Sequence, residues 1–116
     1  MNARTGLDVA TALEPAFDSA SRKRGLLGRN DLPVGQALVI APSNMVHTFF
    51  MRFSIDILFV SRAGVVVKAS ERVPARRIVG ALRGFAVIEM RAGSLATSGT
   101  KAGDQLRLAE LPKVSS

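Results

Sequence analysis

The chain lacks cysteine, tryptophan and tyrosine, and it has a single histidine, His47. Without cysteine it cannot form disulfides, use a catalytic thiolate or build a cysteine-based zinc site. One histidine cannot make a multi-histidine zinc site, and the spacing of His47, Asp56 and Glu89 does not indicate a mixed one. We therefore expect neither a metal site nor a cofactor.

Long apolar segments are missing as well. Asp8 interrupts the only weakly apolar stretch of residues 1–14, so this segment does not have the pattern of a signal peptide. No run reaches the roughly 18 apolar residues that a membrane span requires. We therefore predict a cytoplasmic protein without a transmembrane segment.

The 116 residues are enough for one core, and the contents of 47% hydrophobic and 22% charged residues are ordinary for a globular domain. We expect a poorly anchored segment over residues 1–14, a single domain over 15–111 and a tail over 112–116. The net charge is +7, and twelve of the sixteen basic residues are arginine. These residues form no block or tail, which favours a solvated surface over a nucleic-acid interface.

Short apolar runs separated by turn residues predict a fold rich in strands. Strands are predicted over residues 37–41, 46–51, 56–61, 65–70, 85–90 and 105–111. Gly64 can supply the positive φ that the hairpin between the third and fourth of these strands needs. Pro15 can open a helix over residues 16–27, because proline suits a first helical turn. We predict a β-dominated α+β fold, a compact small β-barrel or sandwich with one short N-terminal helix.

Several sequence elements resemble, in order, the motifs of one family. They are Arg-Lys-Arg-Gly-Leu-Leu-Gly-Arg (22–29), His-Thr-Phe-Phe-Met-Arg-Phe-Ser-Ile-Asp (47–56), Ile-Leu-Phe-Val (57–60) with Gly-Val-Val (64–66), Val-Ile-Glu-Met-Arg-Ala-Gly (87–93) and Gly-Asp (103–104). Together they cover residues 16–110 and resemble the domain-of-unknown-function 192 family, which is uncharacterised. The resemblance implies a compact β-rich domain and brings no established reaction.

The chain departs from the family pattern at Leu27, Phe50, Ser54 and Arg91. Members of the family commonly have methionine at the first of these positions, tryptophan or glycine at the second, and proline at the other two. A role that needs the tryptophan or a rigid proline turn is therefore not carried over to this chain.

Three side chains are candidates for chemistry, and each also has a structural interpretation. In the functional interpretation, His47, the only histidine, is a general base at neutral pH. In the structural one, it is a hydrogen-bonded turn residue. Asp56 orders a turn before an apolar strand, or it pairs with Arg52 or His47. Glu89 lies within an apolar strand; if it points inward it needs a partner, which an arginine of the 22–29 element could supply.

The first functional hypothesis is a binding domain for a small anionic ligand or a protein segment, with its site near the 47–56 turn. Its candidate residues are His47, Thr48, Arg52, Asp56, Glu89, Arg22 and Arg29. The hypothesis requires a concave pocket lined by part of that turn. The alternatives are a hydrolase-like enzyme that uses His47 with Asp56 or Glu89, and a nucleic-acid binder that uses the scattered arginines.

Overall fold

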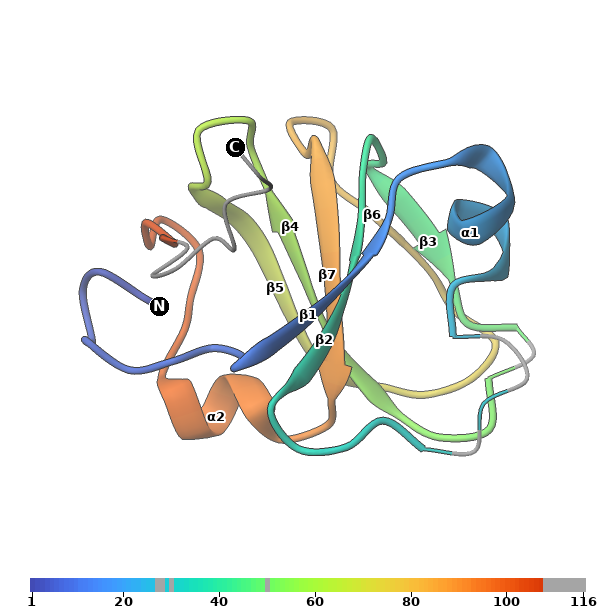
Figure 1. Cartoon of the computed structure of the whole chain (residues 1–116), viewed down its shortest axis with the longest axis horizontal. Coiled ribbons are helices and arrows are strands. Elements are labelled where there is room, and N and C mark those ends of the chain that lie inside the picture. The colour runs from blue at the N-terminus through green and yellow to red at the C-terminus, as the bar shows by residue number, and fades with distance from the viewer. Residues whose placement is uncertain (27–28, 30, 50, 108–116) are drawn as a thin grey trace, which may run out of the picture.

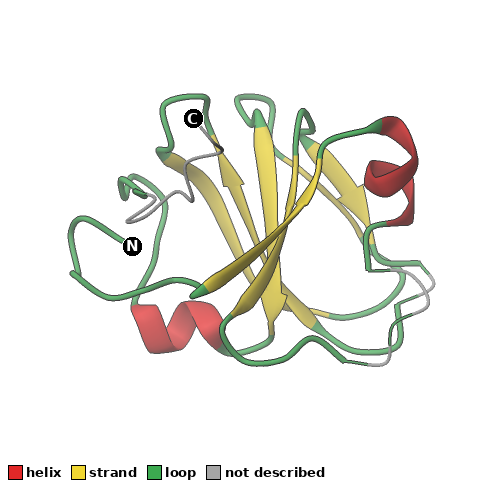
Figure 2. Ribbon diagram, viewed as in Figure 1, coloured by secondary structure: helices red, strands yellow, loops and turns green. Residues whose placement is uncertain are grey.

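The computed structural model describes residues 1–26, 29, 31–49 and 51–107, which form a mostly β fold with two short helices (Figures 1 and 2). The elements in chain order are β1 (Ala12–Ala16), α1 (Ser19–Arg24), β2 (Gln36–Ile40), β3 (Met45–His47), β4 (Ile55–Val60), β5 (Val66–Val73), β6 (Ile78–Gly80), β7 (Ala86–Arg91) and α2 (Ser94–Ser98). The predicted β-dominated class is confirmed. No helix in this part of the chain is long and apolar enough to cross a membrane.

The strands form two sheets. Five strands pair in the order β1-β2-β7-β4-β5, and β3 pairs with β6 in a separate antiparallel ladder. Within the larger sheet only the β1–β2 pair is parallel. Because β1 and β5 are its two edges, the described strands do not form a closed barrel, and the β-rich class is the part of the prediction that the structure supports.

Both faces of the larger sheet are covered, which explains the continuous apolar run in β4. Ile55, Ile57 and Phe59 pack on one face with residues next to α1 and on β3 and β6, whereas Leu58 and Val60 pack on the other with residues of α2 and the N-terminal segment. Successive side chains of a strand point to opposite faces, so each face takes alternate residues. The polar side chains of Asp56 in β4 and Glu89 in β7 are therefore buried.

The predicted strands 37–41, 56–61, 65–70 and 85–90 correspond to β2, β4, β5 and β7. The predicted strand 46–51 is much shorter, because β3 ends at His47. Of the predicted strand 105–111, the described part makes only isolated bridges, at Gln105 and Leu106. Its residues 108–111 and the predicted tail 112–116 lie outside the described residues.

The predicted helix begins three residues too early. Pro15 and Ala16 belong to β1, where proline is tolerated because β1 is an edge strand. Helix α1 begins after Asp18, whose Oδ1 accepts a hydrogen bond from the Ser21 N–H at 2.8 Å. This bond lowers the pKa of Asp18. The helix ends before Gly25, whose φ of 48° favours glycine, and the predicted end at Leu27 lies outside the described residues.

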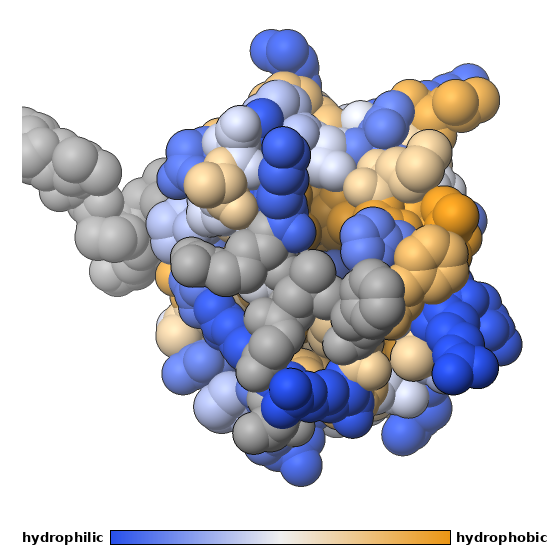
Figure 3. All heavy atoms as spheres, turned by 90° about the vertical axis from the view of Figure 1, so that its right-hand side faces the viewer, coloured by the Kyte–Doolittle hydropathy of each residue, from blue (hydrophilic) through white to orange (hydrophobic). Residues whose placement is uncertain are grey.

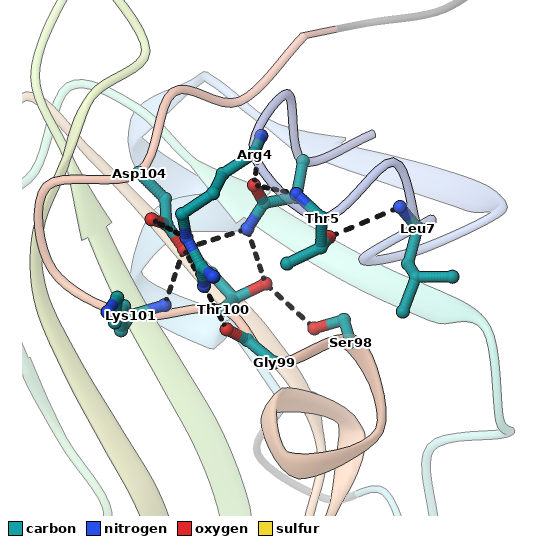
Figure 4. Close-up of polar contacts among 9 residues, drawn as sticks. Arg4, Thr5, Leu7, Ser98, Gly99, Thr100, Lys101 and Asp104 are labelled. Carbon is teal, nitrogen blue, oxygen red and sulfur yellow. Dashed lines mark hydrogen bonds and ion pairs between the residues drawn. The ribbon is translucent and has the colours of Figure 1, made fainter.

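Asn2 and Arg4, near the start of the chain, contact residues around position 100 (Figure 4). Asn2 is fully buried, and its Nδ2 donates to Asp104 Oδ2 at 2.9 Å and to Thr100 Oγ1 at 3.2 Å. Arg4 Nε donates to Asp104 Oδ1 at 2.7 Å. These contacts, led by the bond from Arg4, hold the pKa of Asp104 well below its usual range. The two ends of the domain are thus joined through one carboxylate.

Asp104→Asn should lower the melting temperature at neutral pH, because it removes the acceptor shared by Asn2 and Arg4. A depressed pKa means that the carboxylate stabilises the fold fully above its unfolded pKa of about 3.9, and that this contribution declines as the pH falls below that value. The difference between parent and variant should therefore shrink in acid. Thermal unfolding followed by circular dichroism at about pH 7 and pH 3 measures it. Asp8→Asn, at an exposed aspartate, is the matched control, and a constant difference across this range would contradict the assignment.

Candidate functional site

A cavity of about 490 Å³ lies between α1, β3 and the larger sheet. It is within the range of roughly 300–1,000 Å³ that small-molecule sites occupy. On the face of the molecule that carries α1, hydrophobic residues gather in a hollow between hydrophilic ones (Figure 3). The residues that line the cavity are Ser19, Arg22, Lys23, Gly25, Leu26, Ile40, Pro42, Ser43, Met45, Val46, His47, Met51 and Glu89.

Glu89 reaches the cavity because of its place in the central strand β7. It lies opposite Leu38 of β2 and Ile57 of β4, both of which pack in the core cluster on the α1 side of the sheet. The alternation of side chains therefore turns Glu89 to that side, together with Val87. Only 4% of Glu89 is exposed. The inward orientation, which the sequence left open, is the one that the fold adopts.

The Glu89 carboxyl group has no hydrogen bond or ion pair with any of the described residues. Burial raises its pKa to about 7, and the positive charge of Arg29 opposes this shift without a direct bond. Among the described residues, every side-chain nitrogen or oxygen atom that is shielded from solvent has a hydrogen-bond partner. The Glu89 oxygens have no such partner, so they are accessible from the cavity that Glu89 lines. Gly25 lies beside this carboxyl group, because a Cβ at that position would be in ordinary van der Waals contact with Glu89 Oε1, at 3.7 Å.

Arg29 was predicted to be the partner of Glu89 or part of an anion site, and the structure gives it a different contact. Its Nη1 donates to Glu14 Oε1 at 3.0 Å, and its Nη2 donates to the other oxygen of the same carboxylate. This bidentate pair is the preferred geometry between arginine and a carboxylate. Arg29 does not line the cavity and acts on Glu89 only through its charge.

Two cations do line the cavity, Arg22 and Lys23 in the last turns of α1. Arg22 Nη1 donates to the Phe17 carbonyl, which fixes the guanidinium while leaving further N–H donors on the group. Lys23 is exposed. Sequence reasoning proposed Arg22 and missed Lys23, although the two are adjacent in the basic end of the helix.

His47 lines the cavity from β3 and is an exposed residue. Its ring stacks on Phe49 with the centroids 5.3 Å apart, and its Nδ1 accepts a hydrogen bond from the Phe49 N–H at 3.4 Å. Within the described part of the chain no hydrogen bond joins His47 to a carboxylate. The histidine thus has the turn contact of its structural interpretation, and it also borders the cavity.

Asp56 lies on the opposite face of the sheet from Glu89, because it pairs with Met90, the neighbour of Glu89 in β7. Its carboxylate is fully buried and accepts three backbone hydrogen bonds, from the N–H groups of Arg72 at 2.8 Å, Gly93 at 3.1 Å and Leu95 at 2.8 Å. The last two lie at the start of α2. Asp56 therefore holds β5 and the start of α2 and not the turn before β4, and it does not meet His47.

Thr48 and Arg52 also lie outside the cavity lining. Thr48 is fully buried, and its Oγ1 donates to the Pro74 carbonyl at 2.7 Å and accepts from the Arg77 N–H at 2.9 Å. It fastens the end of β3 to the loop before β6. Arg52 is exposed. Of the predicted site residues, the cavity thus brings together Arg22, His47 and Glu89.

The apolar part of the lining includes Ile40, Val46 and Met51, which also belong to the core on this face of the sheet or pack against it. No local signal distinguishes such residues from others in the core. Among the described residues, no group of three or more histidine, aspartate or glutamate side chains could hold a metal ion.

A family model for the domain-of-unknown-function 192 family, described as uncharacterized ACR, matches residues 2–108. The chain belongs to this family. Its resemblance to the family, recognised from motifs between residues 22 and 104, is thereby confirmed. No curated protein matches the chain.

Two solved structures share the fold of this member of the domain-of-unknown-function 192 family. One is a protein from Sinorhizobium meliloti 1021, described as a candidate transcription regulator, with 22% identity, a TM-score of 0.75 and coverage of 82% of this chain and 79% of the other. The second is a protein of unknown function from Novosphingobium aromaticivorans DSM 12444, with 23% identity, a TM-score of 0.75 and coverage of 83% and 74%. At these identities the likeness establishes the fold alone.

Asp56→Ala should lower the free energy of unfolding by about 3–5 kcal/mol, because it leaves buried backbone donors without their acceptor. Asp56→Asn keeps one side-chain oxygen and should cost less. Urea unfolding of the two variants measures the difference. A loss below about 1 kcal/mol in the alanine variant would show that the carboxylate does not hold α2 in place.

Glu89 should make the fold less stable as the pH rises, because its folded pKa of about 7 lies above the unfolded value near 4.5. Between these values the folded state keeps a proton that the unfolded chain releases, so the free energy of unfolding falls by about 3 kcal/mol up to pH 7. Glu89→Gln, which does not titrate, should lose this fall. Urea unfolding at about pH 5 and pH 8 compares the two proteins.

Glu71→Gln removes an exposed glutamate from β5 and serves as the matched control. This variant should show the same pH dependence as the parent. If Glu89→Gln also follows the parent, the buried carboxyl group does not titrate in this range.

Proposed function

We propose that this protein is a small-molecule binding domain whose site is the cavity between α1, β3 and Glu89. The observation that carries the proposal is a buried carboxyl group without a partner that opens into a cavity of about 490 Å³. Buried ionisable groups with perturbed pKa values gather at functional sites, and a cavity with a few converging polar groups is the usual form of a ligand site.

The lining matches a ligand with an apolar body and an anionic group. Ile40, Met45 and Val46 offer apolar contact, while Arg22 and Lys23 bring two positive charges to the same cavity. A guanidinium binds carboxylate or phosphate through two parallel hydrogen bonds, whereas an ammonium acts as a point charge. The pocket includes His47 and Met51 of the turn region that the sequence favoured.

The geometry gives the two other hypotheses less support. A hydrolase needs a base that is oriented by a second group, yet Asp56 lies on the other face of the sheet, and no bond between His47 and Glu89 is found among the described residues. A nucleic-acid interface needs a continuous basic surface, and Arg22 and Lys23 border a cavity with an apolar part instead.

The binding of three small probes should test the proposal. Caproate, hexylamine and ε-aminocaproate share one hydrocarbon chain and carry an anionic group, a cationic group or both. At millimolar concentrations, at least one should shift the backbone amide NMR signals of α1, β3 and the residues around Glu89. Signals that stay unchanged at the cavity with all three probes would contradict a small-molecule site of this kind.

The variant with Arg22→Ala and Lys23→Ala should weaken the binding of the anionic probes by about three- to tenfold, since it removes both positive charges of the lining. Arg107→Ala is the matched control. The Arg107 N–H donates to the Met1 carbonyl, on the opposite side of the molecule from α1 (Figure 1). An equal loss in both variants would show that net charge, and not the site, attracts the anion.

A further inference from the structure

We infer that the cavity takes a zwitterionic small molecule, whose cationic amino group binds the Glu89 carboxylate and whose anionic group binds Arg22 and Lys23. This inference rests on the proposed function and specifies the class of ligand. Three observations lead to it: the lack of a partner for Glu89, the pairing of Arg29 with Glu14, and the presence of both signs of charge in one cavity.

The first observation is that the fold buries a carboxyl group and supplies nothing to bind it. Glu89 is only 4% exposed and receives no hydrogen bond from any residue that the structure describes. The fold treats its other buried acids differently: Asp56 accepts three backbone N–H groups, and Asp104 accepts bonds from Asn2, Arg4 and Lys101. A buried polar group is normally paired, so the missing donor of Glu89 is the group that a ligand would provide.

The second observation concerns the cations near Glu89. The charge of Arg29 acts on Glu89, but its guanidinium is held by the bidentate pair with Glu14. Arg22 and Lys23 line the same cavity, yet within the described chain neither forms an ion pair with Glu89. The negative charge that Glu89 acquires on ionisation is therefore not matched by a direct contact inside the protein.

The third observation is that the cavity carries a negative group on the sheet and positive groups on the helix. An anion without an amino group would leave the carboxylate unpaired and would be repelled by it, whereas a cation alone would leave Arg22 and Lys23 without a partner. A ligand that carries both charges satisfies both ends. A protonated amine compensates the charge of Glu89 as well as donating a hydrogen bond, which a hydroxyl group does not do.

The pH dependence of binding follows from the groups that face Glu89. Arg22, Lys23 and His47 line the cavity with it, Arg29 acts from the loop after α1, and its cross-strand neighbours Leu38 and Ile57 are apolar. Binding of an amine requires the ionised carboxylate. The ε-aminocaproate affinity should therefore rise by up to about tenfold between pH 6 and pH 8, while its own amine, with a pKa near 10.4, stays protonated.

Isothermal titration calorimetry with ε-aminocaproate, caproate and hexylamine tests this inference on the full chain. We expect ε-aminocaproate to bind most tightly, and we expect Glu89→Gln to weaken it by tenfold or more and to abolish its pH dependence. The caproate affinity should rise in the same variant, because the substitution removes the negative charge that repels this anion. The pH dependence of ε-aminocaproate binding to the parent protein also tests the role of Glu89, without any substitution.

The outcomes separate this inference from the proposed function. If caproate binds as tightly as ε-aminocaproate, in the parent and in Glu89→Gln alike, the cavity binds anions and the role of Glu89 is overturned while the proposed function stands. If hexylamine matches ε-aminocaproate, the contribution of Arg22 and Lys23 is overturned. If none of the three probes binds, the proposed function itself fails.

Discussion

The structure depends on one constraint: its central sheet is covered on both faces, so Asp56 in β4 and Glu89 in β7 are both buried although their side chains point to opposite faces. For apolar residues this arrangement is favourable, because every second residue packs on each side. For an acid it is costly unless partners are present. Asp56 and Glu89 face this constraint on opposite sides of the same sheet, with opposite results.

The buried Asp56 carboxylate accepts hydrogen bonds from backbone N–H groups of the protein itself, and these bonds fix the start of α2. The buried Glu89 carboxyl group opens into a cavity instead, and it keeps its proton up to a pH near neutrality, because its pKa is about 7. The difference arises from what covers each face. On one side α2 directs its first N–H groups at the sheet, while on the other the Glu89 carboxyl group opens into the cavity beside α1.

Much of this fold could be predicted from the sequence, because four of the strands are apolar runs bounded by turn residues and Gly64 adopts the positive φ that its hairpin requires. What failed depends on contacts between distant residues. Pro15 suits a helix start locally, but pairing with Val39 places it in a strand. The contact of Asn2 with Asp104 could not be predicted, because the two residues lie far apart in sequence. The direction of Glu89 stayed open, since strand periodicity defines two faces without saying which one holds a cavity.

The parallel pairing of β1 with β2 has a consequence for the cavity. Two parallel neighbours cannot be joined by a tight turn, so the chain leaves β1 at one end of the sheet and must return to the other end before β2 begins. Helix α1 lies on that return path, and it supplies Ser19, Arg22 and Lys23 to the cavity wall. This wall is therefore part of the crossover connection between β1 and β2, and β1 is an edge strand of five residues. The position of this wall is therefore linked to the pairing of β1 with β2.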